Sequence, residues 1–152
     1  MSRAWIASRI SLALLSLLLG CNSPAPTATP VPSSADVALK ITGLVDQEMA
    51  WAENELRGMP TMEAQRPNEQ GQMDTYTGVS IPQLLEMAGP RADATAVMYV
   101  ADDGESAEVA LKDVMQCEKC IVSFRTKGGF SIVMPDFPSE VQVKGVIEIQ
   151  VK

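Results

Sequence analysis

The sequence contains no histidine and only three cysteines in 152 residues. Without histidine, the Ser-His-Asp and Cys-His arrangements of nucleophilic catalysis are excluded. A structural zinc site takes four ligands, and three cysteines without histidine do not complete one. Glycine-rich phosphate loops and internal repeats are absent as well. Several common classes of enzyme are thus excluded, and no catalytic or metal-binding residue is predicted.

Basic residues are also scarce. The chain has 12 Lys and Arg against 19 Asp and Glu, a formal net charge of −7. Arg3 and Arg9 precede residue 21 and no acidic residue does, so 12 − 2 = 10 basic residues face 19 acidic ones beyond that point. This negative excess argues against binding to nucleic acid or, by the folded part, to anionic lipid. The acidic residues are scattered, which is typical of a solvated surface rather than a cation site.

The N-terminal hydrophobic run is too short to span a bilayer. It covers residues 10–20 after Arg3 and Arg9, a pattern typical of an export signal. The run ends in "LLGC", whose last residue is Cys21, and this ending resembles the lipobox of bacterial lipoprotein precursors. A plain export signal followed by a chance cysteine is the alternative.

The lipobox resemblance implies that the precursor is cut before Cys21 and that this cysteine is acylated, for example with palmitate. One acyl chain anchors a protein only marginally, and the lipoprotein family places two or three on one cysteine. The sequence therefore predicts a lipid-anchored protein at the cell membrane that faces outside the cytoplasm.

The chain divides into three parts. Residues 1–20 are the predicted lipoprotein signal peptide, and residues 21–35 combine the lipidated cysteine with a tether rich in Pro, Ser and Thr. Such a segment favours an extended polyproline conformation, with a length of about 40 Å. Residues 36–152 are long enough for one domain with its own core.

Short strands alternate with a few helices in the predicted domain. Alternating apolar residues, one nearly continuous apolar run at residues 97–101 and the flanks of turns predict strands at residues 37–43, 97–101, 107–111, 121–126, 130–134 and 141–151. The turns at Asp103-Gly104 and at residues 127–129 predict two hairpins. Helices are predicted at residues 49–57, 81–88 and 112–116, the second of which has Ser80 as its cap. The predicted fold class is α+β, with mostly antiparallel strands and short helices.

Five stretches, in order, resemble a known family: "ALKITGLV", "YTGVSIPQLLEMAGP", "VMYVADDGESAEVAL", "FSIVMP" and "VQVKGVIEIQV". The family is that of the sulfite oxidase-like molybdopterin-binding domains, and the resemblance covers nearly all of residues 36–152. It implies a sulfite oxidase-like molybdopterin-binding fold. In that family one protein cysteine ligates molybdenum, from a loop before the Tyr-x-Gly-Val motif.

The corresponding stretch here, "MPTMEAQRPNEQGQMDTYTGV", contains no cysteine. Met62 or Gln65 would replace a soft thiolate poorly, and Glu105 stands where the family commonly has an aromatic residue. Few basic side chains remain for a pterin phosphate; they are Arg66, Arg125 and Lys127. We therefore expect the fold without the cofactor or its chemistry, in a domain that binds a protein or a small-molecule ligand.

Two alternatives remain open. One is an oxidoreductase that retains a molybdopterin cofactor held without a thiolate, and the other is a soft-metal or apolar-ligand site among Met59, Met62 and Met73. Neither changes the predicted fold.

Cys117 and Cys120 form a C-x-x-C motif. This spacing allows a redox dithiol, half of a metal site or a structural disulfide. The motif follows a predicted helix instead of opening one, so the negative end of the helix dipole disfavours a reactive thiolate. Export brings the pair into an oxidising compartment, which favours the disulfide. An oxidoreductase that uses this dithiol is kept as an alternative function.

Overall fold

The computed structural model describes residues 37–68 and 70–152, so the predicted signal peptide, Cys21 and the tether lie outside the described residues. Within these ranges, none of the helices is long and apolar enough to cross a membrane. In chain order the elements are β1 (Leu39–Gly43), β2 (Met49–Trp51), α1 (Glu53–Arg57), β3 (Met62–Pro67), β4 (Met73–Ser80), α2 (Ile81–Ala88), β5 (Ala96–Ala101), β6 (Ser106–Ala110), α3 (Leu111–Met115), β7 (Ile121–Phe124), β8 (Phe130–Val133), the 3-10 helix η1 (Ser139–Val141) and β9 (Val146–Val151).

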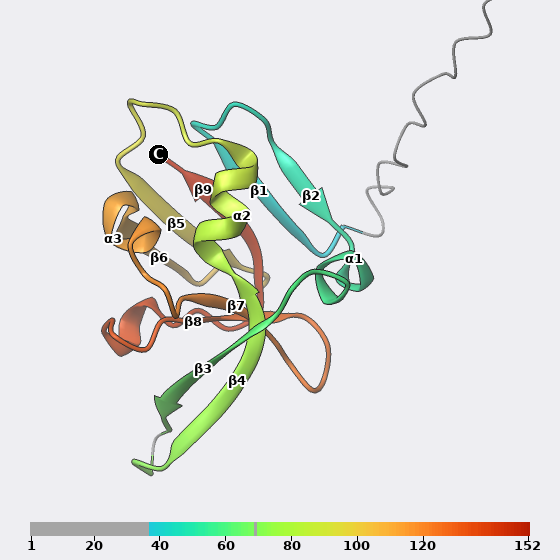
Figure 1. Cartoon of the computed structure of the whole chain (residues 1–152), viewed down its shortest axis with the longest axis vertical. Coiled ribbons are helices and arrows are strands. Elements are labelled where there is room, and N and C mark those ends of the chain that lie inside the picture. Colours follow the sequence, from blue (N-terminus) through green and yellow to red (C-terminus); the bar gives the residue numbers. More distant parts are fainter. Residues whose placement is uncertain (1–36, 69) are drawn as a thin grey trace, which may run out of the picture. The chain divides into compact units, whose positions relative to one another are not determined.

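The strands form two sheets (Figure 1). The larger has the order β2-β1-β9-β5-β6, and the smaller has the order β3-β4-β7-β8. Strands β1 and β9 pair in parallel, and the other strand pairings are antiparallel. The predicted α+β class with mostly antiparallel strands is therefore confirmed.

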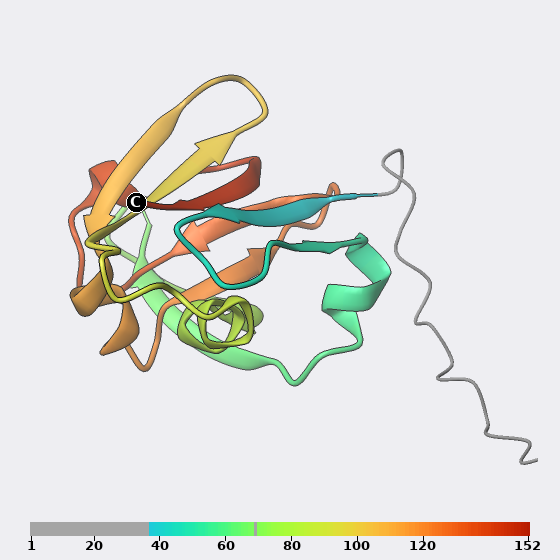
Figure 2. The ribbon, with the colours of Figure 1, turned by 90° about the horizontal axis from the view of Figure 1, so that it is seen from above.

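One main core joins the two sheets. Helix α2 contributes four buried apolar side chains to this core and lies against one face of the larger sheet (Figure 2). Tyr99 of β5 is fully buried in this core, and among the described residues its hydroxyl has no hydrogen-bond partner. Burial raises the pKa of Tyr99, so the phenol stays protonated and contributes to stability by packing.

Local signals account for α2. The Ser80 hydroxyl accepts a hydrogen bond from the Gln83 backbone N–H at 3.4 Å, and Pro82 occupies the first turn. Gly89 ends the helix at a φ of 68°, a left-handed conformation that favours glycine. The prediction of a helix at residues 81–88 is confirmed.

Both predicted hairpins are present, with shifted boundaries. Strands β5 and β6 pair as expected, but their turn covers residues 102–105 because the Ala101 N–H bonds to the Glu105 carbonyl at 2.8 Å. Strands β7 and β8 pair across the turn that contains Gly128 and Gly129, both at positive φ.

Three details of the sequence prediction were wrong. Met49–Trp51 is the edge strand β2 and not the start of a helix, because Leu39 of β1 pairs with Trp51, which is buried. The last strand begins at Val146 and not at residue 141, because Gly145 turns the chain at a φ of 73°. The stretch before the Tyr-x-Gly-Val motif, expected to be a loop, forms most of the hairpin β3–β4.

Candidate functional site

A polar cleft opens where two strands of the smaller sheet diverge. Strands β4 and β7 pair at residues 78–80 and 121–123 only, and the hairpin β3–β4 then projects away from β7 (Figure 1). The space between them, which we call the β4–β7 cleft, has a volume of about 600 Å³. Its lining carries hydroxyl groups, two guanidinium groups, one carboxylate and one phenyl ring, from Arg57, Asp74, Thr75, Tyr76, Thr77, Ser123, Phe124, Arg125, Thr126 and Ser131.

Arg57 is held firmly at one side of this cleft. Its Nε and Nη2 donate to the Glu53 carboxylate at 3.0 and 2.7 Å, and its guanidinium lies 4.5 Å from the centre of the Phe124 ring. The hydrogen bonds from Arg57, together with one from the Gly129 N–H, hold the pKa of Glu53 below its usual value. Arg57 is thus oriented by two neighbours, Glu53 and Phe124, and its charge is largely matched by Glu53.

Arg125 is the second cation of the cleft, and the Asp102 carboxylate lies near its guanidinium, since a Cβ on Gly145 would be 2.5 Å from Asp102 Oδ1 and 3.7 Å from Arg125 Nη1. It follows β7 directly, and its backbone N–H bonds to the Gly129 carbonyl at 3.1 Å. Its side chain forms no salt bridge with any residue from 37–68 or 70–152. A guanidinium beside several hydroxyl groups suits a small oxyanion, to which it donates charge-assisted hydrogen bonds.

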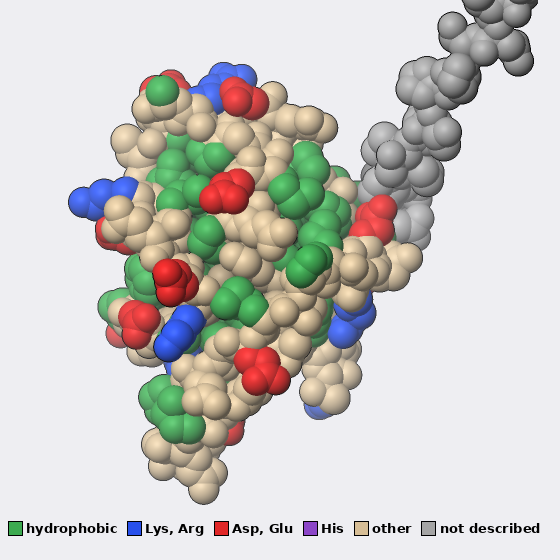
Figure 3. Space-filling view, viewed as in Figure 1, with side chains coloured by type: hydrophobic (Ala, Val, Ile, Leu, Met, Phe, Trp, Pro, Cys, Tyr) green, Lys and Arg blue, Asp and Glu red, His purple; other side chains and the backbone are tan. Residues whose placement is uncertain are grey.

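A second hollow lies beside β3, and we call it the β3-edge groove. Its volume is about 460 Å³, and it is lined by Glu63, Gln65, Pro67, Met73, Lys119, Pro135 and Asp136. A smaller adjoining hollow of about 320 Å³ shares Lys119 and Asp136 and reaches Cys117. Figure 3 shows hydrophobic side chains over the hairpin β3–β4 at the lower end of this face, with charged side chains above them.

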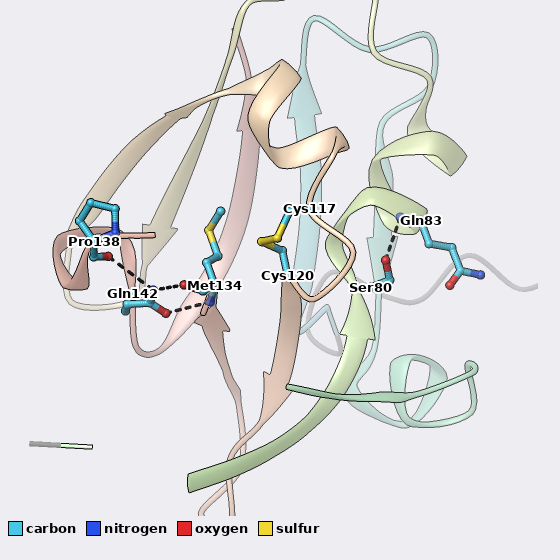
Figure 4. Close-up of a disulfide and its surroundings, with 7 residues drawn as sticks. All are labelled: Ser80, Gln83, Cys117, Cys120, Met134, Pro138 and Gln142. Carbon is cyan, nitrogen blue, oxygen red and sulfur yellow. Dashed lines mark hydrogen bonds between the residues drawn. A yellow bond between two sulfur atoms is a disulfide. The ribbon is translucent and has the colours of Figure 1, made fainter. Parts of the chain in front are cut away.

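Cys117 and Cys120 form a disulfide with Cα atoms 5.5 Å apart (Figure 4). The Cys120 carbonyl accepts a hydrogen bond from the Ile81 N–H at 2.9 Å, which fastens the bridge to the start of α2. Cys117 is 8% exposed and Cys120 is fully buried. Attack by a thiol at Cys117 would therefore release a buried thiolate at Cys120, which burial disfavours. This geometry favours a structural bridge over a redox dithiol.

Replacing both Cys117 and Cys120 by serine is expected to lower the free energy of unfolding by about 2 kcal/mol, the value that loop entropy predicts for a bridge this short. Urea unfolding followed by circular dichroism measures the change. The unmodified protein in reductant should then lose the same amount. An unchanged midpoint in the double variant would show that the bridge contributes nothing to stability.

The residues present do not fit a thiolate-bound molybdenum. The sulfur atoms of Cys117 and Cys120 are bonded to each other, and the β4–β7 cleft presents hydroxyl, guanidinium and carboxylate groups. In the part of the chain that the structure describes, no three His, Cys, Asp or Glu side chains gather to hold a metal ion. A soft metal centre has no suitable donor set there.

The other residues that the sequence singled out lie in different places. Arg125 lines the β4–β7 cleft. Met73 lines the β3-edge groove, Met59 packs on the main core and Met62 packs on a small cluster around Ala64, so these three methionines do not form one site. Sequence reasoning missed Arg57. Its spacing of four residues from Glu53 indicates their ion pair, but only the fold brings the pair to Phe124.

The sheets and short helices define the sulfite oxidase-like molybdopterin-binding fold. A similar solved structure is that of the sulfane dehydrogenase SoxCD from Paracoccus pantotrophus, with a TM-score of 0.65 and 18% sequence identity. The match covers 79% of this chain and 39% of that chain, so this chain spans well under half of the other's length. No protein-family model matches the chain, and no curated protein matches it.

Proposed function

We propose that this protein is a lipid-anchored, extracytoplasmic binding module, whose domain takes up a small oxyanion in the β4–β7 cleft without catalysing a reaction. The observation that carries the proposal is the lining of this cleft. Arg125 forms no salt bridge among the described residues, hydroxyl groups line the same cleft, and the two described cysteines are bonded to each other and offer no thiolate to a metal. Attachment through Cys21 is the part of the proposal that rests on the sequence alone.

The positions of Arg57 and Arg125 in the lining of the cleft support an anionic ligand. Arg57 is already oriented by Glu53 and by Phe124, so the cleft loses little side-chain entropy when a ligand binds. Arg125 offers a planar pair of donors that matches an oxyanion edge. Asp74 at the other side limits the net positive charge and therefore favours a small anion over a polyanion.

Arg125→Gln is expected to weaken the binding of phosphate or sulfate roughly tenfold, because a charge-assisted hydrogen-bond pair is lost. Titration of either anion, followed by amide NMR shifts at residues 123–126, measures the effect. Lys127→Gln is the matched control, since it removes one exposed charge from the same turn without lining the cleft. Equal weakening by both variants, or no saturable shift in the unmodified protein, would contradict the oxyanion site.

The non-catalytic part of the proposal has its own test. Elemental analysis of the purified protein should find no stoichiometric molybdenum, since the expected thiolate ligand is missing. Molybdenum at one atom per chain, together with a pterin chromophore, would overturn it and would favour the alternative of an oxidoreductase. The other alternative, a dithiol enzyme, requires Cys117 and Cys120 to cycle, and the buried position of Cys120 opposes it.

A further inference from the structure

We infer that the open edge of β3 and the β3-edge groove form a docking surface for an extended, basic segment of a partner protein. The segment adds to the smaller sheet as a further strand and places its basic side chains over the groove. This surface is separate in function from the β4–β7 cleft, and its occupant is a protein.

Strand β3 presents backbone groups that no other strand of the described residues pairs. It is the terminal strand of the smaller sheet and pairs with β4 along one edge, which leaves its second edge open. The Asn68 N–H bonds to the Gln72 carbonyl at 2.7 Å, which sets the alternation of hydrogen-bonded pairs along the hairpin. By this alternation Ala64 and Arg66 direct their backbone groups to β4, whereas Glu63 and Gln65 direct their N–H and C=O groups outward. The edge therefore offers donors and acceptors at the spacing that a strand uses.

Charge decides which kind of strand fits. The groove and its adjoining hollow carry Glu63, Asp113, Glu118 and Asp136 against one basic side chain, Lys119. A second copy of this chain would bring another acidic groove to the same edge, and like charges repel. Met73 is 60% exposed beside the groove and offers an adaptable apolar contact. An occupant that alternates basic and apolar side chains meets both features.

The walls of the groove are fixed in place. The disulfide closes the loop that carries Lys119, and the Ile81 N–H bonds to the Cys120 carbonyl. Met134 directly precedes Pro135 and Asp136 of the lining, and the Gln142 side chain accepts from the Met134 N–H at 2.9 Å and donates to the Met134 carbonyl at 2.7 Å (Figure 4). A surface ordered in advance binds at a lower entropic cost.

A short peptide that alternates lysine and valine is the probe for this surface, and the matching glutamate and valine peptide is its control. The basic peptide should slow hydrogen exchange at the Glu63 and Gln65 amides of the full domain, and the acidic peptide should not. Glu63→Gln combined with Asp136→Asn should weaken binding roughly tenfold and reduce its dependence on salt. Glu105→Gln, on the exposed turn between β5 and β6, should leave binding unchanged.

Gln65→Pro separates strand addition from simple charge attraction. Proline is tolerated on an edge strand where the N–H faces outward, so the fold should persist while peptide binding is lost. Failure of the basic peptide to protect Glu63 and Gln65, or equal protection by the acidic peptide, would overturn the inference. So would unchanged binding in a folded Gln65→Pro variant. None of these results bears on the Arg125 anion test, which concerns a different hollow.

Discussion

Gly78→Ala is expected to destabilise the domain by about 3 kcal/mol or more, a large part of the usual stability of a domain. Gly78 lies where β4 meets β7. A Cβ atom there would stand 2.1 Å from the Val122 carbonyl oxygen and 2.7 Å from the Ser123 Cα. These neighbours are backbone atoms, which cannot rotate away as a side chain does. The strands would have to separate, and urea unfolding followed by circular dichroism measures the loss.

Gly58→Ala is the matched control for that variant. Gly58 ends α1 at a φ of −81°, and a Cβ there would lie 3.3 Å from the Glu55 carbonyl oxygen, a close contact that a shift of a few tenths of an ångström at the end of the helix relieves. Its effect should stay below about 1 kcal/mol. Equal midpoints for the Gly78 and Gly58 variants would show that β4 and β7 are not as close in solution as the structure places them.

Cys21→Ser is expected to abolish lipidation completely, because no other residue can carry the lipobox modification. In the native host the mature protein should begin at Cys21 and carry two or three acyl chains. The variant should incorporate no labelled palmitate, and intact mass spectrometry should find no acyl mass. The physical consequence is large, since each buried methylene contributes about 0.8 kcal/mol to membrane attachment.

The variant with Cys117 and Cys120 replaced by serine controls for the loss of a cysteine as such. It should keep both the label and the acyl mass, since these residues lie in the folded domain and are bonded to each other. A mature chain that begins elsewhere, or label that persists in Cys21→Ser, would rule out the lipobox interpretation.

Elements with strong local signals were predictable. Helix α2 has its cap at Ser80 and its stop at Gly89, and both signals act within one turn of the helix. The hairpin β7–β8 was likewise indicated by its turn glycines. Such elements depend on residues that are neighbours in sequence, so the pattern alone is sufficient to place them.

Elements decided by distant partners were not predictable. Strand β2 begins the stretch of residues 49–57 that was predicted to be a helix, but β1 pairs with it and Trp51 is buried in the core. The pattern of alternating apolar residues continues past Gly145, yet the Val143 carbonyl accepts from the Ile132 N–H at 2.8 Å instead of extending β9. Tertiary pairing overrides local preference at these positions.

The candidate site shows the same division. The absence of a cysteine before the Tyr-x-Gly-Val motif was readable from the sequence, and so was the C-x-x-C pair. The β4–β7 cleft was not, because its lining comes from α1, β4 and the β7–β8 hairpin, which are far apart along the chain. The position of Arg57 over Phe124 likewise needs the packed fold.

By itself, the sequence excluded histidine-dependent catalysis and predicted the α+β class and the anchor at Cys21, because these depend on residue types and on local order. Only the tertiary structure decided where polar groups converge and which strand edge stays open. Such features arise when strands distant in sequence meet or diverge, and Gly78 permits one such meeting because it has no side chain to hold β4 and β7 apart.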